Sequence, residues 1–129
     1  IVQIQDKVFD MVEALAMRDR DKVLRLYSDL LELKEPPMKI LAIMGKQFAT
    51  LYGVKCMMDN NSPQGEIAEK LGIRPFFISK YISQAKGFTS KELKCGMKEI
   101  AEYDYMVKSG QMEDTYAVEL IIMKYGRTL

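Results

Sequence analysis

Residues 36–58 read PPMKILAIMGKQFATLYGVKCMM and form the longest apolar run of the chain. Pro37 suits the first turn of a helix, where its missing N–H costs no hydrogen bond. At helical spacing, large apolar side chains fall on one broad side of this run, and small residues fall on the opposite side. A helix that is apolar around most of its circumference is buried. We therefore expect residues 37–58 to be the central helix of an all-α domain, whose small residues let a second helix backbone come close.

The residues on both sides of this run repeat apolar side chains at helical spacing, which predicts further amphipathic helices. Asp19 is placed to cap the second helix, and Thr89-Ser90-Lys91-Glu92 has the pattern of a capping box. Sustained period-2 alternation, typical of strands, is absent, and no internal repeat occurs. The sequence therefore predicts a single helical bundle of about seven helices. We expect these helices to begin near residues 6, 20, 37, 63, 75, 90 and 115.

The size and charge of the chain set limits on its function. Its 129 residues are enough for one domain with one core. The net charge of +1 creates no overall field that would attract nucleic acid or an anionic membrane. Residues 36–98 hold ten Lys/Arg against four Asp/Glu, which permits a local basic surface without requiring one. Because the chain begins at Ile1, we expect residues 1–129 to be one domain excised from a longer protein.

The sequence offers little for catalysis. It contains no histidine, which removes the usual general base and the commonest metal ligand. The pairs Glu66/Glu69 and Glu99/Glu102 share helix faces, but nothing nearby supplies further ligands, so we interpret them as solvated faces. The two cysteines, Cys56 and Cys95, lack the spacing of a metal or redox motif, and we expect them to be reduced and buried, in a cytoplasmic protein. We therefore expect no catalytic residue, no cofactor and no metal.

Residues 65–86 have the pattern of a DNA-binding helix-turn-helix, with a turn glycine at Gly72. This alternative function, a DNA-binding regulator, would place Arg74, Ser79 and Lys80 in a major groove. Two adjacent phenylalanines at residues 76–77 argue against it, because recognition helices use Arg, Lys, Asn and Gln at such positions. We expect both rings to be buried against protein, which would exclude groove reading.

Several stretches of the chain belong together: VFDMVEALA at 8–16, RD at 18–19, LL at 30–31, EPPMKIL at 35–41, QF at 47–48, EIAEKLGI at 66–73, PF at 75–76, Leu93, and 101–110. Taken in order, they resemble the C-terminal domain of the delta subunit of bacterial DNA polymerase III, part of the sliding-clamp loader. The resemblance extends from Val8 to Tyr125. It departs from the family at Ala49, where the family often has arginine, and at Gly45 and Gly53, which are unusual inside that helix.

The resemblance implies a structural role in DNA replication. In that family, the C-terminal helical domains of five subunits pack side by side into a collar. The chain would then be a non-enzymatic C-terminal fragment of one component of a DNA polymerase holoenzyme. Within the collar, it would pack against the gamma/tau and delta-prime subunits through its helix faces. The sliding clamp would be contacted only by an N-terminal region outside this chain.

The family's collar also lies close to the primer–template junction, so the resemblance implies candidate residues for a contact with primer–template DNA. Our candidates for a nucleic-acid contact are Lys108 and Gln111, in the loop at residues 108–112, together with Arg74 and Lys80. An ordinary helix–helix connection is the alternative interpretation of that loop. Large side chains that could serve either an interface or the core are Met17, Tyr52, Tyr105, Met112 and Met123.

Overall fold

The computed structural model describes residues 3–127 and contains seven α-helices and one short 3-10 helix. No strand occurs in that range, so the predicted all-α class is confirmed. None of the helices within it is long and apolar enough to cross a membrane. The elements are α1 (Ile4–Ala16), α2 (Arg20–Glu32), α3 (Pro37–Asp59), α4 (Gln64–Leu71), η1 (Pro75–Phe77), α5 (Ile78–Lys86), α6 (Ser90–Lys108) and α7 (Asp114–Tyr125).

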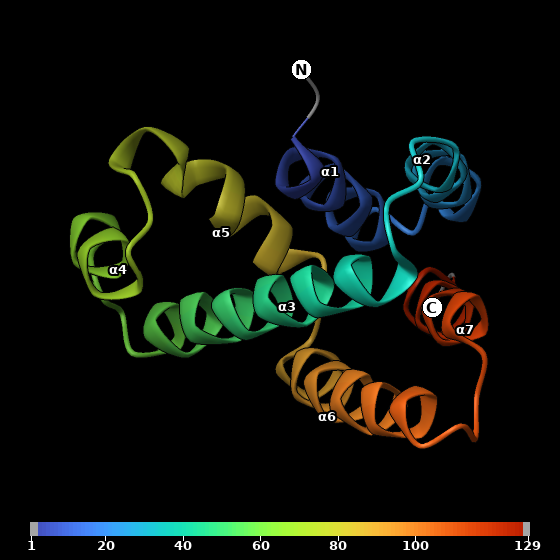
Figure 1. The fold of residues 1–129 in the computed structure, drawn as a ribbon. Helices are drawn as coiled ribbons and strands as arrows, with labels where there is room; N and C mark the ends of the chain where they lie inside the picture. The colour runs from blue at the N-terminus through green and yellow to red at the C-terminus, as the bar shows by residue number, and fades with distance from the viewer. Residues whose placement is uncertain (1–2, 128–129) are drawn as a thin grey trace.

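Helix α3 lies at the centre of the bundle. It packs against α1, α4, α5, α6 and α7, and in Figure 1 it crosses the middle of the molecule with α1 and α5 on one side and α6 on the other. Its Ile40, Met44, Phe48 and Leu51 are fully buried. Burial of such side chains stabilises a fold by about 1.5–3 kcal/mol each. The prediction of a central helix at residues 37–58 is confirmed.

Two glycines on the small-residue side of α3 lie directly against side chains of neighbouring helices. A Cβ built on Gly45 would lie 3.0 Å from the Ile100 side chain of α6, and one built on Gly53 would lie 3.1 Å from the Leu71 side chain. Branched side chains from the neighbouring helices therefore fill the space that the two glycines leave on the surface of α3. The closest approach instead uses a glycine of α6, because a Cβ on Gly96 would lie only 2.4 Å from the ring of Phe48.

Local interactions begin and end the helices largely as the sequence predicts. The Asp19 side chain accepts a hydrogen bond from the Lys22 N–H, and Thr89 and Glu92 form the capping box. Gly72 ends α4 with φ of 67°, a conformation that favours glycine. Four starts differ from the expectation. Helix α1 begins at Ile4, α4 begins at Gln64 after Pro63, and α7 begins at Asp114 itself. The segment expected to begin a helix near residue 75 forms η1, and α5 begins at Ile78.

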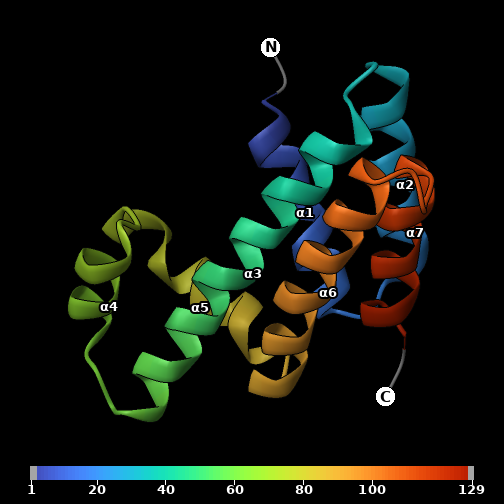
Figure 2. The ribbon, with the colours of Figure 1, turned by 60° about the horizontal axis from the view of Figure 1, so that its bottom comes forward.

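The bundle has two distinct ends. Helices α2 and α7 lie side by side at one end, whereas α4, η1 and α5 lie at the other, as Figures 1 and 2 both show. Arg18, just after α1, connects several helix termini by hydrogen bonds to Gly87, Glu92 and Tyr125. Helix α3 spans the distance between the two ends.

Candidate interaction surfaces

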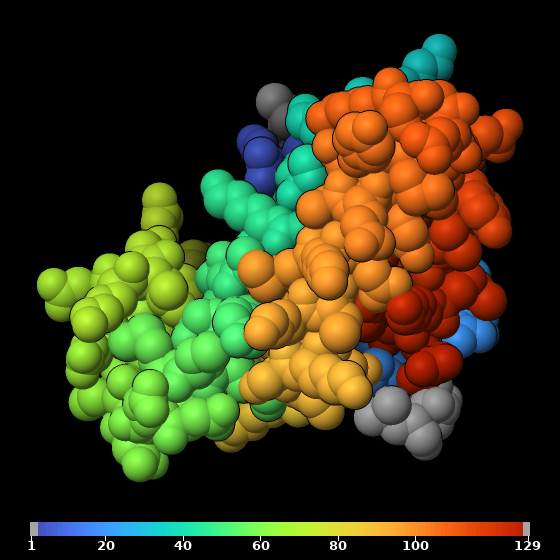
Figure 3. Space-filling model, turned by 90° about the horizontal axis from the view of Figure 1, so that it is seen from below, coloured from blue at the N-terminus to red at the C-terminus, as the bar shows by residue number. Residues whose placement is uncertain are grey.

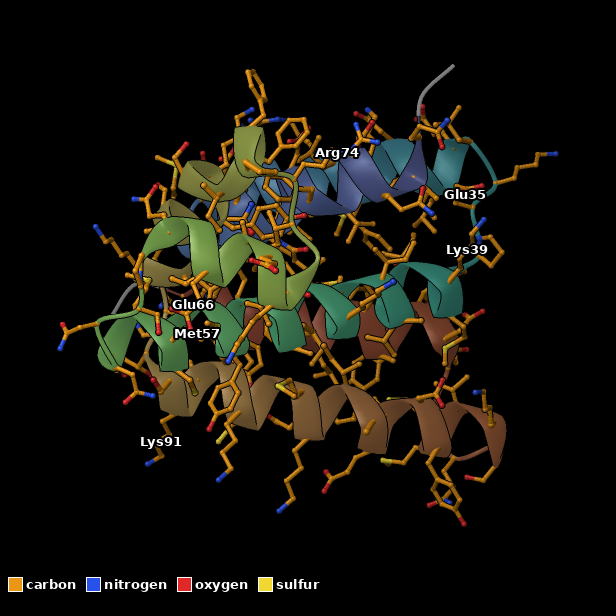
Figure 4. All side chains as sticks on the ribbon, turned by 90° about the vertical axis from the view of Figure 1, so that its left-hand side faces the viewer. Glu35, Lys39, Met57, Glu66, Arg74 and Lys91 are labelled. Carbon is orange, nitrogen blue, oxygen red and sulfur yellow. The ribbon has the colours of Figure 1, made fainter. Side chains whose placement is uncertain are left out.

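The four candidates for nucleic-acid contact do not form one surface. Lys108 lies at the end of α6, where its ammonium pairs with Asp104 at 2.9 Å, and Gln111 donates a hydrogen bond to the Ser109 hydroxyl. Arg74 precedes η1 and Lys80 lies on α5, at the opposite end of the bundle (Figures 1 and 4). The structure therefore separates the two pairs.

The paired glutamates lie on helix surfaces. Glu66 pairs with Lys70 of its own helix at 3.9 Å, and Glu99 accepts hydrogen bonds from Lys124 and Tyr125 of α7. Burial raises the pKa of the Glu99 carboxyl, but the Lys124 and Tyr125 donors together lower it by more, so the net pKa lies below its usual range. Over residues 3–127, no group of three or more His, Cys, Asp or Glu side chains could hold a metal ion. Glu99 thus ties α6 to α7.

The helix-turn-helix segment folds as α4, the Gly72 turn, η1 and α5. The expected burial of its two phenylalanines is wrong: Phe76 is 85% exposed and Phe77 is 38% exposed. Their rings contact each other edge to face, with centroids 5.2 Å apart. The short helix η1 buries none of its three residues, and α5 buries Ile78 and Ile82 instead. Because the two rings are exposed, the expectation that their burial would exclude DNA reading does not apply.

A groove of about 600 Å³ lies beside these rings, between α1, α3 and the segment from residue 71 to α5. We call it the α1–α3 groove. Its apolar lining comes from Phe9, Ile43, Leu71, Ile73, Phe77 and Tyr81. Its polar lining comes from Gln5, Asp6, Asp10, Glu13, Lys46, Gln47, Thr50 and Lys80, with Gly72 at the turn.

Hydrogen bonds at the base of the groove fix the three helices that form it. Gln84 of α5 is buried at 2% exposure, although it is polar. Its side-chain oxygen accepts a hydrogen bond from Gln47 of α3 at 3.0 Å, and its amide donates to the Phe9 carbonyl of α1 at 3.3 Å. The Phe9 and Tyr81 rings contact each other edge to face, 5.2 Å apart. A buried polar group with both partners in place holds one arrangement, so the groove is preformed.

A second exposed apolar surface lies at the other end of the bundle, and we call it the α2–α7 face. It contains Leu24 and Leu31 of α2 and Tyr116 and Met123 of α7, all at least partly open to solvent. Within each helix the two residues are seven apart and therefore share one face. The helices run antiparallel, since Arg20 donates to the Met123 carbonyl and Tyr27 approaches the Thr115 carbonyl. Each of these two packed helices therefore presents an exposed apolar pair, and the name refers to these four side chains.

The structure also separates the side chains whose role the sequence left open. Met17, Tyr105 and Met123 are exposed, whereas Tyr52 and Met112 pack partly against the core. The expected burial of both cysteines is wrong, because Cys95 is exposed and Cys56 is only half-buried. Of these five, Met123 belongs to the α2–α7 face, and the other four lie outside both apolar surfaces. Sequence reasoning missed Leu24 and Leu31, because a leucine in an amphipathic helix is normally assigned to the core.

Helix α6 carries a row of lysines that sequence reasoning did not single out. Lys91, Lys94 and Lys98 are exposed and spaced by three and four residues, so they lie along one face of the helix. Helix α6 occupies the centre of the view in Figure 3, and Lys91 extends away from the bundle in Figure 4. The spacing of these lysines was visible in the sequence and could have identified them.

Comparison with known proteins agrees with this architecture. The family model for the C-terminal domain of the DNA polymerase III delta subunit matches residues 5–125. The chain is 27% identical over 121 residues to DNA polymerase III subunit delta of Bacillus subtilis, covering 94% of this chain and 35% of that protein. It is 26% identical over 88 residues to the probable subunit delta of Aquifex aeolicus, covering 67% and 25%.

A solved structure gives the same result. The DNA clamp loader delta protein of Bacillus subtilis superposes with a TM-score of 0.88 at 27% identity, over 96% of this chain and 37% of that one. The chain thus spans about a quarter to a third of the length of the curated relatives it matches. The family model covers nearly all of the chain, which therefore belongs to the family formed by the C-terminal domain of the DNA polymerase III delta subunit.

Proposed function

We propose that this chain is a non-catalytic assembly module of a clamp loader, which packs against other loader subunits in a collar. Membership of the delta C-terminal family is the observation that carries the proposal. The neighbours that the family implies are the gamma/tau and delta-prime subunits. A DNA-binding regulator is not favoured, because the family match includes the whole helix-turn-helix segment at residues 65–86.

The two exposed surfaces support this role. A domain that packs side by side with others in a collar has two neighbours and needs two faces. The α1–α3 groove is formed by α1, α3 and the segment from residue 71 to α5, whereas the α2–α7 face belongs to two other helices. Exposed apolar patches of this kind are typical of protein–protein interfaces. Aromatic and methionine side chains are enriched at the centres of such interfaces, as Tyr116 and Met123 would be here.

Size-exclusion chromatography tests the proposal. We expect the full-length protein that contains this chain to co-elute with the purified ATPase-bearing loader subunits of its own organism. Tyr116→Glu, on the α2–α7 face, should weaken that assembly, because it places a carboxylate in an apolar contact. Tyr105→Glu is the matched control, since Tyr105 is also exposed but belongs to neither surface. Failure of the unsubstituted protein to co-elute at several salt concentrations would refute the proposal.

Contact with primer–template DNA through Lys108, Gln111, Arg74 and Lys80 stays a prediction. Phosphate contacts by lysine and arginine make binding strongly salt-dependent. Replacing Lys108 with alanine in the assembled loader should therefore reduce the salt dependence of primer–template binding. The same change at Lys22, an exposed lysine of α2, is the control.

A further inference from the structure

The α1 wall of the α1–α3 groove is acidic in a regular pattern. Asp6, Asp10 and Glu13 are spaced by four and three residues and therefore lie in one line along α1. Seven residues of helix extend over about 10 Å, or two turns. No salt bridge joins any of these three carboxylates to another residue between positions 3 and 127. The wall thus presents uncompensated negative charge beside an apolar floor.

The other walls carry the opposite charge. Lys46 of α3 and Lys80 of α5 line the same groove, and neither forms a salt bridge within the described part of the chain. Each of the three helices also contributes an apolar side chain to the groove, namely Phe9 from α1, Ile43 from α3 and Tyr81 from α5. The groove therefore combines an acidic row on α1, one lysine on each of α3 and α5, and an apolar lining.

We propose that the α1–α3 groove binds one amphipathic helix of a neighbouring clamp-loader subunit, with a row of Lys/Arg facing α1 and acidic residues facing Lys46 and Lys80. This inference rests on the proposed function. An α-helix suits the site because its apolar stripe has charged edges on both sides, the arrangement that the groove complements. The basic row needs spacings of three and four residues, because only such positions stay in line with Asp6, Asp10 and Glu13. Phe77 lines the site and would cover an apolar residue of the docked helix.

A second copy of this chain is the alternative occupant that the experiment must separate. Lys91, Lys94 and Lys98 on α6 have spacings of three and four residues, and read in the reverse direction they match the spacings of Asp6, Asp10 and Glu13. Two copies could in principle associate through α6 and the groove. Such a contact would be head to tail rather than two-fold, so it would not close at the dimer and would produce larger species as the concentration rises.

Photocrosslinking identifies the occupant. Phe77 is partly exposed at the edge of the groove, so p-benzoylphenylalanine can replace it without opening the core. The full-length protein with this substitution is assembled with the purified loader subunits, irradiated and analysed by mass spectrometry. We expect a crosslink to a helical segment of another subunit that bears Lys/Arg at spacings of three and four residues. A crosslink to a second copy of the same protein, or to a segment without such a row, would overturn the inference.

Charge reversal supplies an independent measurement. The Asp6→Lys/Asp10→Lys variant should assemble about tenfold more weakly than the unsubstituted protein, and the loss should diminish at high salt. Glu69→Lys/Glu102→Lys makes the same change in net charge at exposed carboxylates outside the groove, and it should assemble normally. Circular dichroism checks that all variants are folded.

The two proposals fail in different ways. If the unsubstituted protein does not join the other subunits, both the proposed function and the groove assignment are overturned. If it assembles, but position 77 gives no crosslink between subunits and the Asp6/Asp10 variant binds as well as the control, the groove assignment alone is wrong. Assembly by the α2–α7 face would then account for the interaction.

Discussion

Replacing Arg18 with alanine should destabilise the bundle, because its guanidinium joins the ends of four helices. The guanidinium donates to the carbonyl oxygens of Tyr125 at 2.7 Å and Gly87 at 2.9 Å, and to the Glu92 carboxylate at 2.9 Å. It also lies 5.4 Å from the centroid of the Phe88 ring. These partners belong to α6, α7 and the segment after α5, whereas Arg18 itself follows α1.

The size of the effect follows from these contacts. A hydrogen bond to a charged group contributes about 1.5–3 kcal/mol, and a cation–π contact contributes about 0.5–1 kcal/mol. The sum of these contributions overestimates the loss in free energy of unfolding. Arg18 and Glu92 are only partly buried, at 13% and 20% side-chain exposure, so hydrogen bonds to water replace part of those that are removed. Removing one partner of a buried ion pair costs about 3–5 kcal/mol, so we expect about 3 kcal/mol at this partly open site. Arg18 has φ of 60°, and alanine keeps the same backbone strain, so the comparison isolates the guanidinium.

Urea unfolding followed by circular dichroism measures this loss. Arg18→Ala should lower the urea midpoint at an unchanged m-value. Arg18→Lys should have an intermediate effect, because an ammonium lacks the planar fork that reaches three acceptors. Arg25→Ala is the control, since Arg25 is exposed on α2 and forms no salt bridge with residues 3–127. A free energy of unfolding for Arg18→Ala within about 0.5 kcal/mol of this control would refute the reasoning.

Further predictions concern acid stability and glycine packing. Burial raises the pKa of Glu92 and Glu99, but their donors lower it by more, so both pKa values lie below the usual range. The two ionised carboxylates therefore stabilise the folded protein above the unfolded pKa of about 4.3, and this stabilisation is lost as the pH falls through the folded pKa. In an acid titration, the free energy of unfolding of Glu92→Gln should fall less steeply below about pH 4.3 than that of the unsubstituted protein. Gly96→Ala should cost about 1–3 kcal/mol in thermal or urea unfolding, because its Cβ would overlap the Phe48 ring. Gly65→Ala meets nothing within 4 Å and should instead stabilise α4 by about 0.5 kcal/mol; equal effects of the two glycine substitutions would contradict the packing argument.

Much of the fold could be predicted because its signals are local. The central helix was recognisable from its nearly uniform apolar character, and the caps at Asp19 and Thr89 depend on residues only three positions apart. The packing of α3 against its neighbours was not predictable in the same way. Gly45 and Gly53 indicated close contact but not which side chains would pack against them. The closest contact between α3 and α6 is at Gly96 of α6, which packs against the Phe48 ring.

The candidate site depends on tertiary geometry, which explains why the sequence predicted it poorly. The spacing of Asp6, Asp10 and Glu13 was visible, but their importance arises only when Lys46 and Lys80 line the same groove. The exposure of Phe76 likewise depends on the short helix η1, which buries none of its residues, and no periodicity in residues 74–78 predicts that helix. Gln84 gave no signal at all, since its partners lie 37 and 75 residues away.

The position of α3 determines how the two surfaces can act together. This helix has 23 residues and is about 35 Å long, and it contacts α5 of the groove as well as α7 of the opposite face. Bonds from Gln84 fix α5 to α1 and α3 at one end, while Arg18 fixes the termini of α5, α6 and α7 to α1. A continuous helix bends little, so a neighbour on the α2–α7 face and a helix in the groove would be held at a fixed separation and angle. If both surfaces are interfaces, the module therefore acts as a rigid spacer, and substitutions in the α3 core should alter assembly geometry without touching either partner.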